Sequence, residues 1–189
     1  MKSKNNIYSF TTFFIKTGSK YIRNVRIREF FLEKKVIFHF LALNYNYGIN
    51  EEDISLFKKA ISFLFNEIIL EIEYYDTECT EIKSQKVRNQ DTLKENWNKL
   101  KTELLVENKG VCIEEYFQQI DKIINNTDLL LDFVYQHSVY GVFLKAKDNM
   151  QSIFYQDNTL KETSCIDTDL RYEILIKKTL KKEKSMKNK

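Results

Sequence analysis

The chain has 189 residues, of which 43% are hydrophobic and 14% aromatic, and its formal net charge at pH 7 is +3. This length and apolar content suffice for one folded domain with a sizeable core, and they exclude a disordered body. The sequence has no proline and only four glycines, which are too far apart to form a phosphate-cradling loop. Three widely spaced cysteines, Cys79, Cys112 and Cys165, predict buried or half-buried apolar side chains in a reducing, cytoplasmic compartment.

The first third of the chain predicts an antiparallel meander. Residues Ile7–Lys16 are rich in the aromatic and β-branched types that favour strands, and Thr17–Ser19 predicts a turn. Apolar and mainly cationic residues alternate over 25–31, which indicates a second strand with one apolar face. After a turn at 33–35, the almost continuously apolar stretch Val36–Tyr47 predicts a strand that is buried on both faces.

The centre of the chain predicts about three helices. Asn50 is a suitable N-cap for the first helix, whose apolar residues between Ile54 and Ile72 recur at spacings of three and four. Residues 70–74 alternate between apolar and acidic types, so a final strand is an open alternative there. A polar connection is expected over 77–90.

Two further helices follow this connection. Thr92 and Glu95 form a capping-box pattern ahead of an apolar stripe, and the cluster at 108–110 predicts the end of the second helix. A third helix is predicted from the stripe Ile113–Ile124, with its end at 125–126. Because the connections are short, we expect these helices to pack antiparallel.

The last third of the chain returns to strand patterns. Val139–Lys147 and Met150–Gln156 flank Asp148 and Asn149, which tolerate positive φ, and the pattern predicts a β-hairpin. Leu170–Ile176 predicts one more strand, and 177–189 predicts a lysine-rich, disordered tail. The sequence therefore predicts an α+β fold with a single domain over 1–176. Its antiparallel sheet combines the N-terminal meander and the C-terminal hairpin strands, with about three central helices packed on it.

Charge is distributed unevenly along the chain. Residues 1–28 carry seven basic residues and no acidic one, residues 51–82 carry nine acidic residues against two lysines, and residues 177–189 carry seven lysines against one glutamate. The first segment also has the charge pattern of an organellar transit peptide, but its residues are better interpreted as strands. Separated charge of this kind can steer a charged partner. The candidate interaction residues are basic and lie in the second strand and the tail: Lys20, Arg23, Arg26, Arg28, Lys177, Lys178, Lys181 and Lys182.

Histidine, the usual acid–base group near neutral pH, occurs only twice. His39 lies inside an apolar run and is interpreted as a hydrogen-bonded core histidine. His137 lies near a predicted junction between a helix and a strand. A catalytic pair of His137 with Cys112 or Cys165 would require a proximity that the sequence alone does not establish.

A nuclease is a further alternative. Asp76, Glu81 and Lys83 have the spacing of a magnesium site with an adjacent lysine, but they fall in a predicted connection rather than on a strand of a core sheet. Aromatic residues interleaved with basic ones near the N-terminus could stack on single-stranded bases, although no signature of an RNA-recognition domain accompanies them.

In the absence of a catalytic, metal or cofactor motif, we expect a non-catalytic protein that binds a protein partner and needs no cofactor. The residue usage indicates AT-rich coding DNA, and an inhibitor or immunity-type accessory protein of a phage or mobile element, or a subunit of a larger assembly, agrees with separated charge on a compact domain. The alternative is a nucleic-acid-binding accessory protein that uses the basic strands and tail. A metal-dependent nuclease is the least favoured alternative. No apolar stretch reaches the roughly 20 residues of a membrane span, so no membrane contact is expected.

Overall fold

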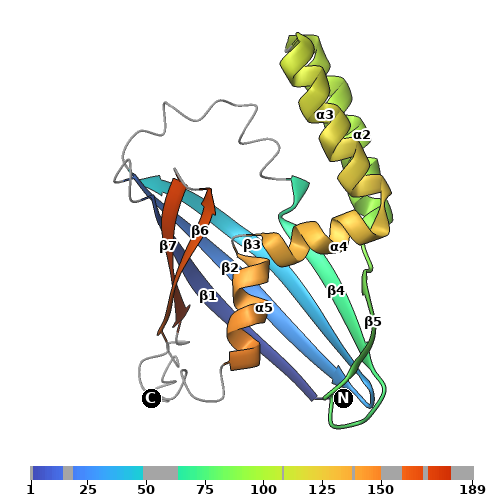
Figure 1. Cartoon of the computed structure of the whole chain (residues 1–189), viewed down its shortest axis with the longest axis vertical. Helices are drawn as coiled ribbons and strands as arrows, with labels where there is room; N and C mark the ends of the chain where they lie inside the picture. Colours follow the sequence, from blue (N-terminus) through green and yellow to red (C-terminus); the bar gives the residue numbers. More distant parts are fainter. Residues whose placement is uncertain are drawn as a thin grey trace, which may run out of the picture.

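The computed structural model describes residues 2–14, 19–48, 64–107, 109–137, 139–149, 159–167 and 170–179. Within these residues, seven antiparallel strands form one sheet in the order β5-β4-β3-β2-β1-β7-β6. Two helices, α4 and α5, lie across one face of the sheet, and two others, α2 and α3, rise together beyond its end (Figure 1). The predicted α+β class is confirmed.

The three predicted strands of the meander are present and long. They are β1 (Lys2–Phe14), β2 (Ser19–Leu32) and β3 (Lys35–Gly48), and each pairs with the next in antiparallel register. Val25 and Ile27 of β2 are buried beneath the helices, whereas Arg26 and Arg28, which alternate with them, are partly exposed. We call the face toward the helices the inner face of the sheet and the opposite face the outer face.

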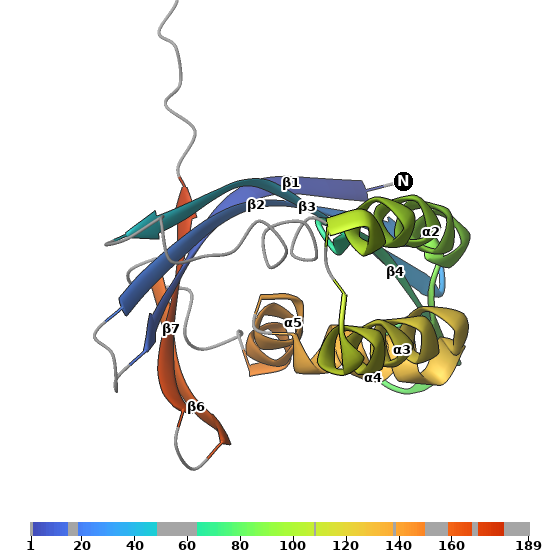
Figure 2. The same cartoon turned by 90° about the horizontal axis from the view of Figure 1, so that it is seen from above.

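The prediction that β3 is buried on both faces is wrong. Val36, Phe38 and Phe40 are buried on the inner face, but Ile37 and His39 between them keep part of their surface exposed. No described helix crosses the outer face (Figure 2), so among the described elements only neighbouring strands shield the side chains there. The apolar run of β3 therefore alternates between a true core face and a half-covered one.

Two more strands complete this side of the sheet. The alternation at 70–74 belongs to β4 (Glu67–Tyr74), so the strand alternative is correct there, and the predicted helix with the apolar stripe Ile54–Ile72 is wrong from Glu67 onward. The part of that helix at 50–63 lies outside the described residues. β5 (Ile82–Val87) overturns the polar connection predicted over 77–90. As an edge strand, β5 buries only Val87 and leaves its polar residues to solvent and to charge contacts, which explains its misleading composition.

The first two described helices form a hairpin, α2 (Gln90–Glu107) and α3 (Val111–Asn125), as the sequence predicts. The predicted capping box is wrong, because α2 begins before Thr92 and its first turn follows Asn89. The Asn89 side chain accepts a hydrogen bond from the Ile69 amide at 2.9 Å and donates one to the Glu67 carbonyl at 2.8 Å. These bonds fix the start of α2 against β4.

Two further helices follow, and the second of them replaces part of the predicted C-terminal hairpin. Asn126 caps α4 (Thr127–Gln136) by accepting hydrogen bonds from the amides of the first turn, and α5 spans Tyr140–Asn149. The strand predicted at 139–147 and the turn at 148–149 are therefore wrong. Tyr140, Phe143 and Leu144 are spaced as one helical stripe and are buried against the sheet. The partner strand predicted at 150–156 lies outside the described residues.

A C-terminal hairpin does exist, but other residues form it: β6 (Thr159–Asp167) and β7 (Leu170–Thr179). β7 begins at the predicted residue and pairs with β1, where Phe10 lies opposite Ile176. Since β7 continues to Thr179, the first three residues of the predicted tail belong to a strand. The remainder of that tail, 180–189, lies outside the described residues.

Aromatic side chains join α5 to the sheet. The ring centroid of Phe40 lies 4.9 Å from that of Tyr140 and 5.9 Å from that of Phe143, and Tyr8 packs edge-on against Phe143 at 5.2 Å. The Tyr140 hydroxyl also donates a hydrogen bond to the Phe65 carbonyl. The core therefore lies between the inner face of β1–β4 and the helices.

Inside the helical hairpin, one carboxylate holds two side chains of the opposite helix. Asp121 of α3 accepts a hydrogen bond at 2.6 Å from the indole nitrogen of Trp97 and one at 2.5 Å from the ammonium of Lys101. Trp97 is only 1% exposed, so its N–H has no access to water as an alternative acceptor. Asp121 thus fixes the register of the two helices.

Replacing Asp121 with alanine is expected to lower the free energy of unfolding by about 2 kcal/mol, because the buried Trp97 N–H loses its acceptor. Urea unfolding followed by the fluorescence of Trp97, the single tryptophan, measures this loss. Lys101→Ala is the matched control and should cost less than about 1 kcal/mol, because a partly exposed ion pair contributes little. Equal losses in the two variants would show that the indole bond is not the important contact.

Candidate functional site

The predicted basic interaction residues do not share one surface. Arg26 and Arg28 lie on the outer face of β2, but Arg23 lies on the inner face, two residues before the buried Val25. The sequence placed all three in one cationic set. Strand alternation separates them, and only Arg26 and Arg28 of the three lie together on the face that the described helices leave open.

The lysines of the predicted set are placed only by their backbone register, because their side chains lie outside the described part of the structure. Lys20 of β2 lies opposite Phe13, and on β7 Lys177 lies opposite Ser9. Lys178 follows Lys177 on the same strand. Two further members, Lys181 and Lys182, fall outside the described residues.

Arg23 meets His137 at the junction between α4 and α5. Its guanidinium nitrogen lies 3.4 Å from the Nε2 atom of His137, whose ring stacks on Tyr140 with a centroid distance of 4.3 Å and an interplanar angle of 16°. Phe133 packs edge-on against the same ring at 5.7 Å. Burial, and then the positive charge of Arg23, lower the pKa of His137 to about 3. His137 is therefore neutral at any physiological pH, although the residue keeps some exposed surface.

This histidine is placed for structure rather than for proton transfer. Its Nδ1 atom also accepts a hydrogen bond from the Val139 amide at 3.2 Å, and a neutral imidazole has only one accepting nitrogen, so the contacts to Val139 and Arg23 compete. Cys112, one of the two cysteines considered as a partner for His137, is exposed in the first turn of α3, at the far end of the hairpin from α4. The structure thus separates His137 from Cys112, and the side chain of Cys165 lies outside the described residues.

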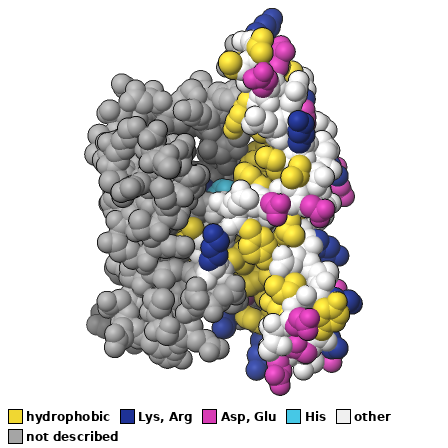
Figure 3. Space-filling view, in the orientation of Figure 1, with side chains coloured by type: hydrophobic (Ala, Val, Ile, Leu, Met, Phe, Trp, Pro, Cys, Tyr) yellow, Lys and Arg dark blue, Asp and Glu magenta, His cyan; other side chains and the backbone are white. Residues whose placement is uncertain are grey.

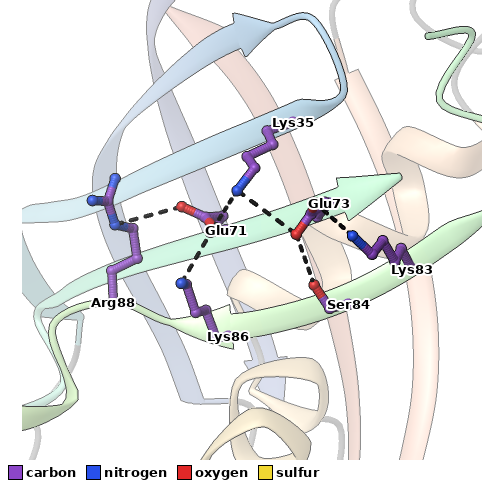
Figure 4. A network of polar contacts seen from close by, with 7 residues as sticks. All are labelled: Lys35, Glu71, Glu73, Lys83, Ser84, Lys86 and Arg88. Atoms are coloured by element: carbon purple, nitrogen blue, oxygen red, sulfur yellow. Dashed lines mark hydrogen bonds and ion pairs between the residues drawn. The ribbon is translucent and has the colours of Figure 1, made fainter. Parts of the chain in front are cut away.

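A network of charged side chains covers the outer face of β3, β4 and β5 (Figure 4). Its centre is Glu71, which is 7% exposed and lies among three cations. The distances from its carboxylate oxygens are 3.5 Å to the Lys35 ammonium, 3.4 Å to the Lys86 ammonium and 3.6 Å to the Arg88 Nε atom. A buried carboxylate requires such compensation, so the acidic alternation of β4 is matched by basic residues of its neighbours.

Glu73 extends the same network toward the β4–β5 connection. Its carboxylate lies 3.1 Å from the Lys83 ammonium and 3.7 Å from that of Lys35, and it accepts a hydrogen bond from Ser84 at 3.3 Å. The hydrogen bond from Lys83 is the main cause of the lowered pKa of Glu73, and the charge of Lys35 adds to it against the opposing effect of desolvation. Four cations therefore surround two carboxylates, and the network carries excess positive charge.

His39 also lies on the outer face and is not the core residue that the sequence predicts. Its Nε2 atom lies 2.6 Å from the Glu67 carboxylate, on a side chain that is 18% exposed. The apolar run around it misled the prediction, because every second residue of that run faces away from the core. The expected hydrogen bond exists, but its partner is a surface carboxylate.

Arg26 and Arg28 differ from the other cations of this face. In the described part of the chain, neither of them makes a hydrogen bond or an ion pair. Arg26 lies opposite Ile7 and Leu41, and the neighbours of Arg28 across the strands are Asn5 and His39. The nearby carboxylate of Glu67 is engaged with His39, so the two guanidinium groups keep their donors available.

The residues of the nuclease alternative, Asp76, Glu81 and Lys83, do not share a centre. The Asp76 carboxylate accepts hydrogen bonds from the Thr80 hydroxyl at 2.6 Å, the Thr80 amide at 3.2 Å and the Glu81 amide at 3.4 Å, and these bonds lower the pKa of Asp76. Lys83 contacts Glu73 instead. Asp76 therefore closes the turn before β5. Among the described residues, no group of three or more His, Cys, Asp or Glu side chains is placed to hold a metal ion.

The tip of the α2–α3 hairpin exposes apolar side chains that the sequence analysis did not single out. Val106 is 74% exposed and Val111 is 70% exposed, and Leu105 beside them is 38% exposed. We call these three residues the hairpin tip. Figure 3 shows hydrophobic side chains next to acidic ones there. The sequence does indicate this exposure, because the apolar residues that pack the two helices together recur every three or four positions and the hairpin-tip residues do not belong to that series.

The remaining predictions concern the cysteines and the membrane. Cys79 is half-buried, as expected, but Cys112 is exposed. None of the described helices combines the length and the apolar character that a membrane crossing requires.

The chain was also compared with known proteins. No family model, no curated protein and no solved structure matched it.

Proposed function

We propose that this protein acts by binding a protein partner through the hairpin tip, as an inhibitor-type accessory protein or as a subunit of a larger assembly. The observation that carries the proposal is the exposure of Val106 and Val111, at 74% and 70%, on the end of a helical hairpin that projects from the sheet. Transfer of a valine side chain from water into an apolar pocket contributes about 1.5 kcal/mol or more. A rigid projection with such residues is suited to insertion into a groove.

The surroundings of the tip specify the chemistry of the partner. Glu103, Glu114 and Glu115 are exposed around it, against one exposed lysine, Lys109. A second copy of the chain would bring these acidic side chains into repulsion, which disfavours self-association through the tip. We therefore expect a different protein whose apolar pocket is bordered by basic residues.

The double variant Val106→Glu/Val111→Glu is expected to abolish this binding, because it places two charges in an apolar pocket and adds to the acidic rim. Quantitative affinity enrichment from the native source should recover one stoichiometric protein with the unmodified chain and not with the variant. Titration calorimetry with that purified protein should then give 1:1 binding that is weakened at least about thirtyfold.

The matched control is Leu32→Glu/Ile82→Glu, which makes the same chemical change at two other exposed apolar residues, 41% and 48% exposed. It should bind as the unmodified chain does. Equal binding by the tip variant, or equal loss in the control, would refute the proposal, provided that circular dichroism confirms folding of both variants.

A further inference from the structure

Outside the hairpin tip, the outer face of the sheet carries a second feature, Arg26 and Arg28 of β2, which have no hydrogen-bond or ion-pair partner among the described residues. We infer that this face binds single-stranded nucleic acid, with Arg26 and Arg28 holding neighbouring phosphates. The inference is independent of the proposed protein partner, because the two surfaces share no residue.

The outer face of the sheet is accessible to a ligand. The described helices leave the outer face uncovered (Figure 2), and Arg26 and Arg28 keep part of their surface exposed. The broad, open surface of long strands can receive an extended chain, whereas it does not have the protruding shape that enters a duplex groove. A single strand is therefore the form of nucleic acid that this face can accommodate.

The outer face of the sheet carries excess positive charge. Among the described side chains on the outer face of β2–β5, six cations stand against three carboxylates, and each of those carboxylates already has a basic partner or His39 within 4 Å. The cations are Arg26, Arg28, Lys35, Lys83, Lys86 and Arg88. Because the carboxylates are compensated, the excess positive charge is not cancelled within the described chain, and an anionic ligand is complementary to it.

The guanidinium groups of Arg26 and Arg28 have a chemistry and a spacing that suit phosphates. Each guanidinium presents a planar fork of donors that fits a phosphate in bidentate fashion. Arg26 and Arg28 are two residues apart on one strand, so their Cα atoms are about 7 Å apart and their side chains lie on the same face. This spacing allows each arginine to hold a different phosphate of one extended strand.

Uncharged side chains lie beside the two arginines along β2. Phe30, the next outer-face residue of β2 after Arg28, is partly exposed, and an aromatic ring on a sheet can stack on a base of any sequence. Asn24 lies on the other side of Arg26 along β2, and its side-chain amide donates a hydrogen bond to the Asn44 side chain at 2.9 Å. These two amide side chains place further polar groups beside Arg26. Aromatic, cationic and amide side chains thus follow one another along β2.

The test uses the full chain and fluorescence anisotropy with labelled oligothymidine, oligouridine and a duplex of equal length. We expect the single strands to bind more tightly than the duplex. In Arg26→Gln/Arg28→Gln, affinity for the single strands should fall at least about tenfold. The slope of log K against log salt concentration should decrease by about 1.4, since each phosphate contact on a single strand contributes roughly 0.7.

Lys99→Gln/Lys122→Gln is the matched control, because it removes the same charge from exposed positions on the helical hairpin. It should retain the affinity of the unmodified chain, as should the hairpin-tip variant, so failure of this inference and failure of the proposed protein partner are distinguishable. Thermal unfolding of all variants should be unchanged, since the two arginines have no described partner to lose.

Three results would overturn the inference: equal affinity of the arginine variant and the unmodified chain, an equal loss in the lysine control, or preference for the duplex. An acidic peptide that competes with equal affinity and the same dependence on Arg26 and Arg28 would also overturn it, because the ligand would then be an acidic protein segment.

Discussion

Replacing Gly141 with alanine is expected to destabilise the fold by at least about 3 kcal/mol. A Cβ atom at this position would lie 1.9 Å from the carbonyl oxygen of Tyr135 and 2.5 Å from its carbonyl carbon. These are backbone atoms of the last turn of α4, so they cannot move aside as a flexible side chain would. The close approach of α5 to α4 therefore requires glycine here.

Urea unfolding monitored by circular dichroism measures this effect as a lower midpoint at unchanged slope. Gly110→Ala provides the comparison, because a Cβ there would meet no atom within 4 Å while the backbone φ of 131° remains unfavourable for alanine. Its cost should be about 1 kcal/mol. If Gly141→Ala costs no more than Gly110→Ala, the two helices do not pack as described.

Acidification is expected to destabilise the unmodified chain more steeply than His137→Gln, by up to about 1.4 kcal/mol per pH unit between pH 6 and pH 4. In the unfolded chain His137 takes up a proton below about pH 6.5, but in the folded chain its pKa is about 3. The unfolded state thus binds more protons across this interval, so stability is complete above pH 6.5, falls as the pH is lowered, and stops falling near pH 3.

Free energies of unfolding at pH 7, 6, 5 and 4 for both proteins provide the measurement. Glu73 and Asp76, whose pKa values are lowered by hydrogen bonds, also weaken the fold in acid, but they do so equally in both proteins. The difference between the two curves therefore isolates His137. Parallel curves would mean that the ring is protonated in the folded chain and that Arg23 does not constrain it.

The sequence predicted correctly those elements in which the spacing of apolar residues matches the face that is buried in the fold. The meander, the hairpin of α2 and α3 and the strand that starts at Leu170 have patterns that burial alone explains. α5 was mistaken for a strand because its valine and aromatic residues favour β-structure locally, and Asp148 with Asn149 imitates a hairpin turn. Packing of Tyr140 and Phe143 on the sheet outweighs these local preferences.

The candidate sites were less accessible to sequence reasoning, because they depend on which strands become neighbours. Arg23 and His137 are far apart in the chain, and no local pattern indicates their contact. The ion pair of Glu71 with Lys86 likewise depends on β5, for which the sequence predicts a connection instead of a strand. In contrast, Arg26 and Arg28 were correctly assigned to one face from alternation alone, since that inference needs only the geometry of a single strand.

The pairing of β1 with β7 has a consequence for how the protein is made. β1 is a central strand of the sheet, yet one of its two neighbours is the strand Leu170–Thr179. During translation, β1 can pair with β2 early, but its second edge stays open until β7 has also left the ribosome. A nascent or truncated chain that lacks β7 would expose this edge, and we expect such chains to associate with one another through it.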